Sequence, residues 1–153
     1  MLNDPVNGLD LTGLVKCNAE QNHFFEELLD PVRRVANQYG FDPNFLLGLA
    51  AHESGWLGKH GQELNNVFGV TLGGGPNLRW ESLEDAAAYW GRTYGSKVQG
   101  AKSIDDFINK LQTDQRQQGG LGSYNTEDSK WAKKVHGAYK AVGDRRGVCP
   151  CER

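Results

Sequence analysis

Helix start and stop signals recur along the chain and constrain its fold more than any other feature. Asp30 precedes Pro31 and Asp42 precedes Pro43, so each aspartate is placed to cap a helix whose first residue is proline. Gly40 is placed to end the first of these two helices. The 27 Leu and Ala residues, against 12 Ile and Val, also favour helices over sheet. The sequence therefore predicts a mainly α-helical protein.

Serine capping boxes predict two further helices. Residues 82–85 and 103–106 both fit the S-x-x-D pattern, in which a hydroxyl and a carboxylate bond to free backbone N–H groups. An apolar stripe of helical period follows the second box. It consists of Ile104, Phe107, Ile108 and Leu111. We expect this helix to run until Gly119 and Gly120.

The rest of the chain is predicted to hold one more helix and one hairpin. The helix begins at about Glu127 and ends at Gly143. Its apolar face carries Trp131, Val135, Tyr139 and Val142. Between residues 65 and 80, β-branched and aromatic residues surround a Gly-Gly-Gly-Pro-Asn cluster, which predicts one short β-hairpin. Residues 1–21 and 144–153 lack periodicity and are expected to be irregular.

Length, charge and motifs exclude several classes of protein. A chain of 153 residues fits one domain, residues 1–153, without a second catalytic domain. The net charge of −2 gives no general attraction to phosphate, so no nucleic-acid partner is expected. Neither a membrane-spanning run nor a signal peptide is evident, so we expect no membrane insertion and no export by the general secretory route. No phosphate-binding loop or His/Cys cluster is evident, so we expect no cofactor and no metal.

Three cysteines lie near the two ends of the chain. They are too few for a disulfide scaffold, and their spacing does not fit a zinc site. A disulfide between Cys17 and either Cys149 or Cys151 would join the two ends and imply an oxidising compartment. Three free thiols would instead fit a reducing compartment. The sequence leaves both states open.

The helix that begins at Pro43 ends its apolar face on a carboxylate. That face carries Leu46, Leu49 and Ala50. Continuing the same period reaches Glu53 in the last turn, where burial and the negative end of the helix dipole are expected to raise its pKa. A carboxyl group held protonated is suited to donate a proton to a glycosidic oxygen. The alternative is a glutamate that reaches solvent or pairs with Lys59 or His60.

Three blocks of sequence resemble a known enzyme family. FDPNFLLGLAAHESGWLGKHGQELNNVFGVT at residues 41–71 resembles the signature of glycoside hydrolase family 73, which comprises peptidoglycan N-acetylglucosaminidases with a lysozyme-like helical fold. RWESLEDAAAYW at residues 79–90 and GSYNTEDSKWAKKVHGAYKAV at residues 122–142 are similar to the blocks that follow it in that family. The resemblance covers about residues 24–142 and implies a lysozyme-like, mainly α domain with one short β-hairpin.

The resemblance also implies roles for individual residues. Glu53 takes the position of the catalytic acid, and Tyr124 matches a tyrosine that faces this acid in the sugar groove. Four more residues are implied to form the groove: Trp56, Asn66, Phe68 and Gly69. Simpler roles are the alternatives: core packing for the aromatic residues, a turn for the glycine, and a hydroxyl bonded to backbone for Tyr124. His60 and Trp80 are further groove candidates.

A second catalytic carboxylate is not evident at the position where the resemblance implies it. Glycoside hydrolysis usually takes two carboxylates, and the family places the second on the hairpin. Residues 70–79, VTLGGGPNLR, contain no Asp or Glu. Glu63 and Glu81 flank this segment and are the candidates for the role. Alternatively, the 2-acetamido oxygen of the sugar acts as the nucleophile, with Tyr124 positioning it.

The expected function is hydrolysis of the β-1,4 glycan backbone of peptidoglycan by an N-acetylglucosaminidase. A lytic transglycosylase or muramidase of the same fold, as in phage lysins, is one alternative, and a catalytically idle module that binds glycan or protein is another. The chain also resembles compact antibacterial effectors that type VI secretion delivers into rival bacteria. That resemblance implies action in the periplasm of a target cell, and a monomer whose groove is occupied by a cognate immunity protein.

Overall fold

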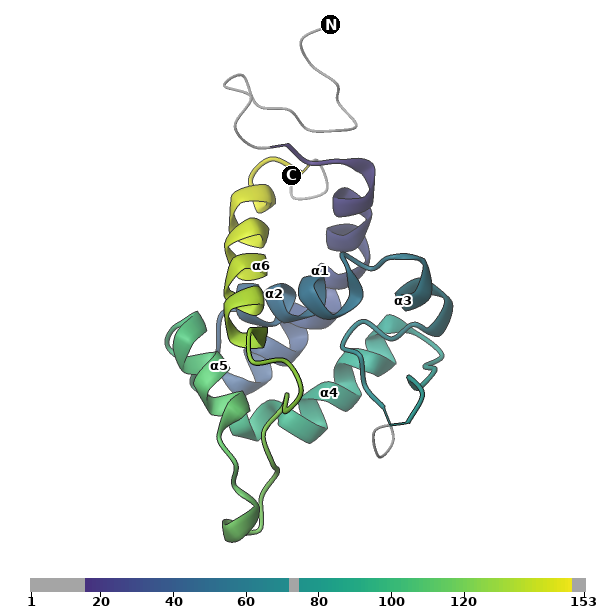
Figure 1. The fold of residues 1–153 in the computed structure, drawn as a ribbon. Coiled ribbons are helices and arrows are strands. Elements are labelled where there is room, and N and C mark those ends of the chain that lie inside the picture. The colour runs from purple at the N-terminus through teal and green to yellow at the C-terminus, as the bar shows by residue number, and fades with distance from the viewer. Residues whose placement is uncertain (1–15, 72–74, 150–153) are drawn as a thin grey trace, which may run out of the picture.

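A computed structural model describes residues 16–71 and 75–149, which form a helical bundle (Figure 1). Six α-helices and one short 3-10 helix are present in these ranges. They are α1 (Ala19–Tyr39), α2 (Pro43–Ser54), α3 (Lys59–Leu64), α4 (Leu83–Val98), α5 (Ile104–Gln112), η1 (Arg116–Gln118) and α6 (Trp131–Arg146). The predicted mainly helical fold is therefore confirmed. None of the described helices combines the length and apolar character that crossing a membrane requires.

Three of the predicted helix starts are confirmed by their caps. The side chain of Asp42 accepts a hydrogen bond from the backbone N–H of Asn44, and Pro43 is the first residue of α2. Ser82 accepts from the N–H of Asp85 at 3.1 Å, and the equivalent serine bond at the start of α5 is 3.0 Å long. Each cap satisfies a backbone donor that the first helical turn leaves free. The predicted end of the last of these helices is wrong, since α5 ends at Gln112 and not at Gly119.

The first helix begins earlier than the sequence predicts. Asn18 and Gln21 form a reciprocal capping box, so α1 begins at Ala19, and Pro31 lies inside the helix rather than at its start. An internal proline removes one hydrogen bond, but a buried face formed by this helix offsets that loss. The face includes Phe24, Phe25, Leu28, Leu29 and Val32. The expectation of an irregular segment up to residue 21 is therefore wrong from residue 19 on, and residues 1–15 lie outside the described part.

The last helix is displaced toward the C-terminus relative to its prediction. Asn125 accepts hydrogen bonds from the N–H groups of Glu127 and Asp128, and these turn bonds replace helical ones before Trp131. The helix then continues through Gly143 to Arg146. Gly143 is thus not its end, and residues 144–146 are not irregular as expected. Residues 150–153 lie outside the described part.

No strand is present in the described residues of the segment where a hairpin was predicted. A single antiparallel bridge joins Thr71 to Asn77, and the N–H of Leu78 donates to the carbonyl of Val70 at 2.9 Å. The prediction of a β-hairpin is therefore wrong. Side-chain bonds from Asn66 hold both sides of this loop together, so the loop keeps its shape without a ladder of backbone hydrogen bonds.

Helix α2 lies at the centre and packs closely against α6. Seven consecutive residues of α2, from Phe45 to Ala51, are buried. A Cβ atom added to Gly48 would lie 2.7 Å from the Cα atom of Tyr139, closer than such atoms approach in proteins. The two helices therefore touch through their backbones. This contact fixes where the start of α6 lies relative to the end of α2.

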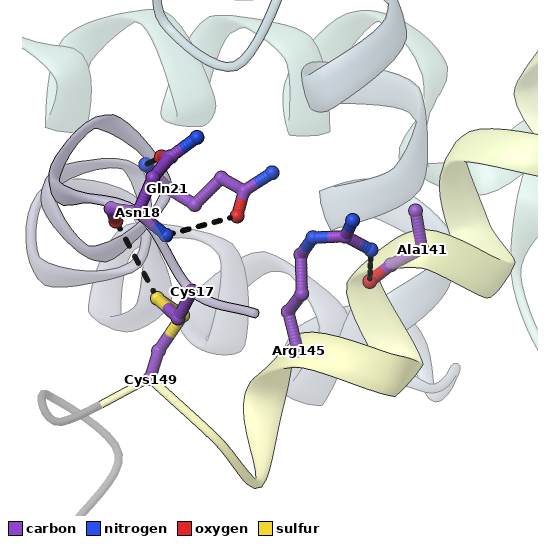
Figure 2. The surroundings of a disulfide bond; sticks show 6 residues. All are labelled: Cys17, Asn18, Gln21, Ala141, Arg145 and Cys149. Atoms are coloured by element: carbon purple, nitrogen blue, oxygen red, sulfur yellow. Dashed lines mark hydrogen bonds between the residues drawn. A yellow bond between two sulfur atoms is a disulfide. The ribbon is translucent and has the colours of Figure 1, made fainter. Parts of the chain in front are cut away.

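A disulfide joins the two ends of the described chain. Cys17 and Cys149 are bonded, with their Cα atoms 5.1 Å apart, and both residues are fully buried. Figure 2 shows the bridge between the start of α1 and the segment after α6. Of the two pairings and the free-thiol state that the sequence left open, the structure therefore has the bridge to Cys149. Cys151 lies outside the described residues.

The helix contact at Gly48 is expected to be sensitive to a single methyl group. Gly48→Ala should lower the free energy of unfolding by about 1–3 kcal/mol, because the added Cβ forces α2 and α6 apart. Gly137→Ala is the matched control, since a Cβ at that position of α6 meets nothing within 4 Å. It should raise stability by about 0.5–1 kcal/mol through helix propensity. Denaturant unfolding measures both, and equal stability of Gly48→Ala and wild type would contradict the close contact.

The disulfide is expected to contribute substantially to stability. The bridge closes a separation of 132 residues, so Cys17→Ser should lower the free energy of unfolding by about 2–5 kcal/mol. Cys151→Ser should leave it unchanged, because that cysteine is not part of the bridge. Denaturant unfolding with and without a reductant measures these effects. A loss of stability in Cys151→Ser and none in Cys149→Ser would show that the pairing is wrong.

Candidate active site

The end of α2 presents Glu53 to a cleft. The helix ends at Gly55, which adopts the left-handed conformation at φ 58°, a conformation that glycine adopts without strain. The hydroxyl of Ser54 donates to the carbonyl of Ala50 and accepts from the N–H of Leu57, so the turn after the helix is fixed. Glu53 therefore lies on a rigid helix end, half-buried, as the apolar period of α2 predicted.

Trp131 holds the Glu53 side chain. Its indole Nε1–H donates to Oε1 of Glu53 at 2.9 Å. Trp131 is the first residue of α6 and exposes 1% of its surface, so it is a rigid donor. The backbone contact between α2 and α6 positions these two side chains together. The acid candidate is thus held by a partner 78 residues further along the chain.

The cleft beside Glu53 has a volume of about 190 Å³. It is lined by Glu53, Phe68, Gly69, Val70, Thr71, Tyr94, Tyr124 and Asn125. Gly69 has a φ of 64°, and a Cβ added to it would lie 3.4 Å from Oε2 of Glu53. The glycine therefore serves a turn and also leaves one oxygen of the carboxylate open to the cleft.

Tyr124 lies in the same cleft and is held by aromatic neighbours. Its hydroxyl accepts a hydrogen bond from Nε1 of Trp90 at 3.1 Å and donates to the carbonyl of Phe68 at 3.5 Å. Its ring centroid is 4.8 Å from that of Tyr94, in an edge-on arrangement, and 5.6 Å from that of Trp131. Glu53 and Tyr124, which the sequence resemblance assigns to one groove, therefore both line this cleft.

The environment of the cleft changes the pKa values of Glu53 and Tyr124. Burial raises the pKa of Glu53, and the Trp131 hydrogen bond and the neighbouring His52 oppose that increase. Burial first, and the negative charge of Glu53 second, raise the pKa of Tyr124 well above its ordinary value. Glu53 is therefore suited to hold and donate a proton. Tyr124 stays protonated and is suited to donate a hydrogen bond, not to act as a base.

Two residues expected in the groove have structural contacts instead. The side chain of Asn66 is buried and bonds to backbone groups of Val70 and Leu78, so it shapes the cleft wall without lining the cleft. The ring of Trp56 packs edge-on against Phe24 and Phe25, and the Arg145 guanidinium lies over it, 5.8 Å from the ring centroid. Trp56 is also not among the lining residues. Of the four implied groove residues, Phe68 and Gly69 line the cleft.

The two candidates for a second carboxylate lie outside the cleft. The side chain of Glu63 is 55% exposed on α3 and lies 4.0 Å from the ammonium of Lys59. Glu81 is exposed and borders a different surface hollow. The further candidates His60 and Trp80 do not line the cleft either. Glu53 is thus the one carboxylate among the described residues that line it.

Sequence reasoning missed Trp131 and four of the residues that line the cleft: Val70, Thr71, Tyr94 and Asn125. Trp131 was assigned only to an apolar face, although a buried indole N–H requires an acceptor and so signals a polar partner nearby. Tyr94 and Asn125 line the cleft but belong to no pattern that marks them.

The described residues contain no group of metal ligands. Within residues 16–71 and 75–149, no three His, Cys, Asp or Glu side chains lie where they could hold an ion.

Solved structures share this fold. One is the structure of a type VI secretion system effector–immunity complex from Pseudomonas protegens, with 24% identity, a TM-score of 0.67, and coverage of 84% of this chain and 94% of that chain. Another is the peptidoglycan hydrolase from Sphingomonas sp. A1, with 19% identity, a TM-score of 0.64, and coverage of 85% and 94%. No curated protein sequence matches the chain.

The family match covers the site. Residues 29–143 match the glucosaminidase family, described as mannosyl-glycoprotein endo-beta-N-acetylglucosaminidase. This range includes Glu53, Trp131 and Tyr124, together with every other residue that lines the cleft. The match spans most of the chain and agrees with the resemblance found in its three sequence blocks. The chain belongs to the glucosaminidase family.

Proposed function

We propose that the protein is a glycosidase that hydrolyses the β-1,4 glycan backbone of peptidoglycan, as an N-acetylglucosaminidase with Glu53 as general acid. The observation that carries this proposal is a half-buried carboxyl group, with a raised pKa, that is held at a cleft by a tryptophan N–H. The family description supports cleavage beside N-acetylglucosamine. The peptidoglycan hydrolase of the same fold supports the choice of polymer.

In the first step, Glu53 donates its proton to the glycosidic oxygen as the bond from that oxygen to C1 breaks. Its Oε1 is engaged by Trp131, and Gly69 leaves Oε2 accessible from the cleft. The Trp131 bond also stabilises the carboxylate that remains after the proton has left. The hydroxyl of Tyr124, which stays protonated, exchanges its long bond to the Phe68 carbonyl for a hydrogen bond donated to the substrate.

The second catalytic group is supplied by the substrate. The described lining of the cleft holds one carboxylate, and residues 70–79 contain no Asp or Glu. The carbonyl oxygen of the 2-acetamido group attacks C1 and forms a cyclic oxazolinium ion. Water then adds to C1 and gives a proton to the Glu53 carboxylate, which opens the ring and restores the acid. Two displacements at C1 retain its configuration.

The effector–immunity complex of the same fold supports a proposal for the biological role. By this analogy the protein is an antibacterial effector that acts on peptidoglycan in the periplasm of a target cell. The buried Cys17–Cys149 disulfide is compatible with an oxidising compartment of that kind. A cognate immunity protein would then cover the cleft. Incubation with that partner should abolish hydrolysis.

The test of the proposed activity is a digest of purified peptidoglycan by wild type and Glu53→Gln, followed by mass spectrometry of the soluble products. Wild type should release fragments with reducing N-acetylglucosamine ends, and Glu53→Gln should lower the rate by at least about 100-fold because it removes the acid. The variant should still fold, since the glutamine oxygen can accept the Trp131 bond. Glu63→Gln, an exposed glutamate outside the cleft, is the matched control and should keep full activity.

Other products of the same digest would identify a different reaction. Reducing muramic ends would identify a muramidase, and anhydro-muramic ends a lytic transglycosylase, a reaction that also needs only one carboxylate. Proton NMR of the first product should show the β-anomer, since the substrate-assisted route retains configuration. An α-anomer would require a base outside the described cleft. Absence of fragments from folded wild type would leave a glycan-binding module and end the enzyme proposal.

A further inference from the structure

A lysine with a buried ammonium group lies beneath the loop that carries Tyr124. Lys97, in the last turn of α4, exposes 8% of its surface. Its Nζ donates to the carbonyl oxygen of Leu111 at 2.7 Å and to that of Gly122 at 2.6 Å. Lysine is rarely buried unless its charge is compensated, so this arrangement calls for an explanation. The two acceptors are its only hydrogen-bond partners among the described residues.

The two acceptors lie at opposite ends of one loop. Leu111 is in the last turn of α5, and Gly122 is two residues before Tyr124. The intervening residues form an exposed excursion with η1 at its tip, which extends away from the helices in Figure 1. Lys97 therefore links the two ends of this loop from its buried side. These two ends, residues 111–112 and 122–125, are called the neck of the loop.

The same neck holds the cleft residues directly. The carbonyl of Leu111 that accepts from Lys97 also accepts from the backbone N–H of Tyr124 at 3.0 Å. Gln112 and Asn125 exchange two hydrogen bonds, and Ser123 donates to the carbonyl of Gln112 at 2.7 Å. A continuous set of bonds thus runs from the Lys97 ammonium to the backbone of Tyr124 and Asn125, which both line the cleft.

Within residues 16–71 and 75–149, no carboxylate forms an ion pair with the Lys97 ammonium. Burial lowers the pKa of Lys97, and the charge of Asp114 opposes this shift only in part, since the Asp114 carboxylate is bonded to Arg116. Two carbonyl dipoles are thus the direct partners of the charge. This compensation depends on geometry, because it is lost when the carbonyls turn away. A neutral apolar residue of similar length would pack in the same space without fixing the two ends of the loop.

We propose that Lys97 is a positioning residue for the reaction, which holds the Tyr124 edge of the cleft at the distance from Glu53 that hydrolysis requires. The proposal rests on the proposed function. It assigns to Lys97 no contact with substrate. Lys97 holds the Leu111 carbonyl, which also accepts a hydrogen bond from the backbone N–H of Tyr124. The position of this backbone determines where the phenol ring lies. The hydrogen bonds of the phenol hydroxyl with Trp90 and Phe68 depend on that position.

Kinetics of Lys97→Met, alone and combined with Tyr124→Phe, test this role. Lys97→Met should lower kcat by about 10- to 100-fold, as small misplacements in an active site do. In the Tyr124→Phe background the same change should cost less than about 3-fold, since the hydroxyl that Lys97 positions is already absent. Lys102→Met, which removes an exposed lysine outside the cleft, is the control and should leave kcat unchanged. An undiminished effect in the Tyr124→Phe background would overturn the proposal.

Amide hydrogen exchange gives a second readout that does not depend on activity. In Lys97→Met, the N–H groups of Tyr124 and Asn125 should exchange at least about 10-fold faster, while those of α2 keep their protection. Unchanged exchange would contradict the role of Lys97, even if wild type does not cleave peptidoglycan. If Lys97→Met does not fold, Ser123→Ala is the second variant. It removes a hydrogen bond between neutral groups in the same neck, which disturbs the fold less. It should lower kcat and speed exchange of the same amides, and no change in either would overturn the proposal.

Discussion

The backbone contact between α2 and α6 is the constraint on which the rest of the structure depends. It exists because Gly48 has no side chain, so that Tyr139 of α6 lies against the α2 backbone. Glu53 lies five residues after Gly48 on one helix, and Trp131 lies eight residues before Tyr139 on the other. Helices that approach this closely present their ends in a fixed relation. The hydrogen bond between Trp131 and Glu53 follows from it.

The wall of the cleft beside Glu53 contains aromatic rings, and Glu53 is the one charged side chain among the described residues that line it. Trp90 contacts Phe68, Tyr94 and Phe107, and its N–H donates to Tyr124. Such a wall desolvates the cleft, and desolvation is the largest cause of the raised pKa values of Glu53 and Tyr124. The chemistry of the site thus derives from packing. This explains how one carboxyl group in a small cleft is prepared to donate a proton.

Local signals in the sequence were sufficient for most helices and for the place of Glu53 at the end of α2. The caps at Asp42, Ser82 and Ser103 are short-range hydrogen bonds, and the position of Glu53 follows from helical period alone. The start of α1 was missed because the signal at Asp30 and Pro31 is outweighed by burial of the whole helix face, which only tertiary packing determines. The prediction of a β-hairpin was wrong for a related reason, because side-chain bonds from Asn66 hold that loop in place of a ladder of backbone hydrogen bonds.

Contacts between distant residues could not be predicted in this way. In the loop after α3, Asn66 replaces ladder hydrogen bonds with side-chain bonds, and no local pattern marks that role. The pairing of Trp131 with Glu53 joins residues 78 positions apart. The support of Tyr124 by Lys97 likewise runs between separate elements. The sequence therefore located Glu53, whereas the groups that hold its side chain and change its pKa emerge only from the packed helices.

The most direct measurement is a pH titration of the Glu53 carboxyl carbon by NMR, in wild type and in Trp131→Phe. We expect the wild-type pKa to lie above the ordinary glutamate value of about 4.3, because burial disfavours the ionised form. Trp131→Phe should raise it further, since the lost hydrogen bond favours the carboxylate, and hydrolysis should then persist to higher pH. Trp80→Phe, an indole outside the cleft, should change nothing. A wild-type pKa at or below the ordinary value, or a downward shift in Trp131→Phe, would contradict the assignment of Glu53 as a tuned acid.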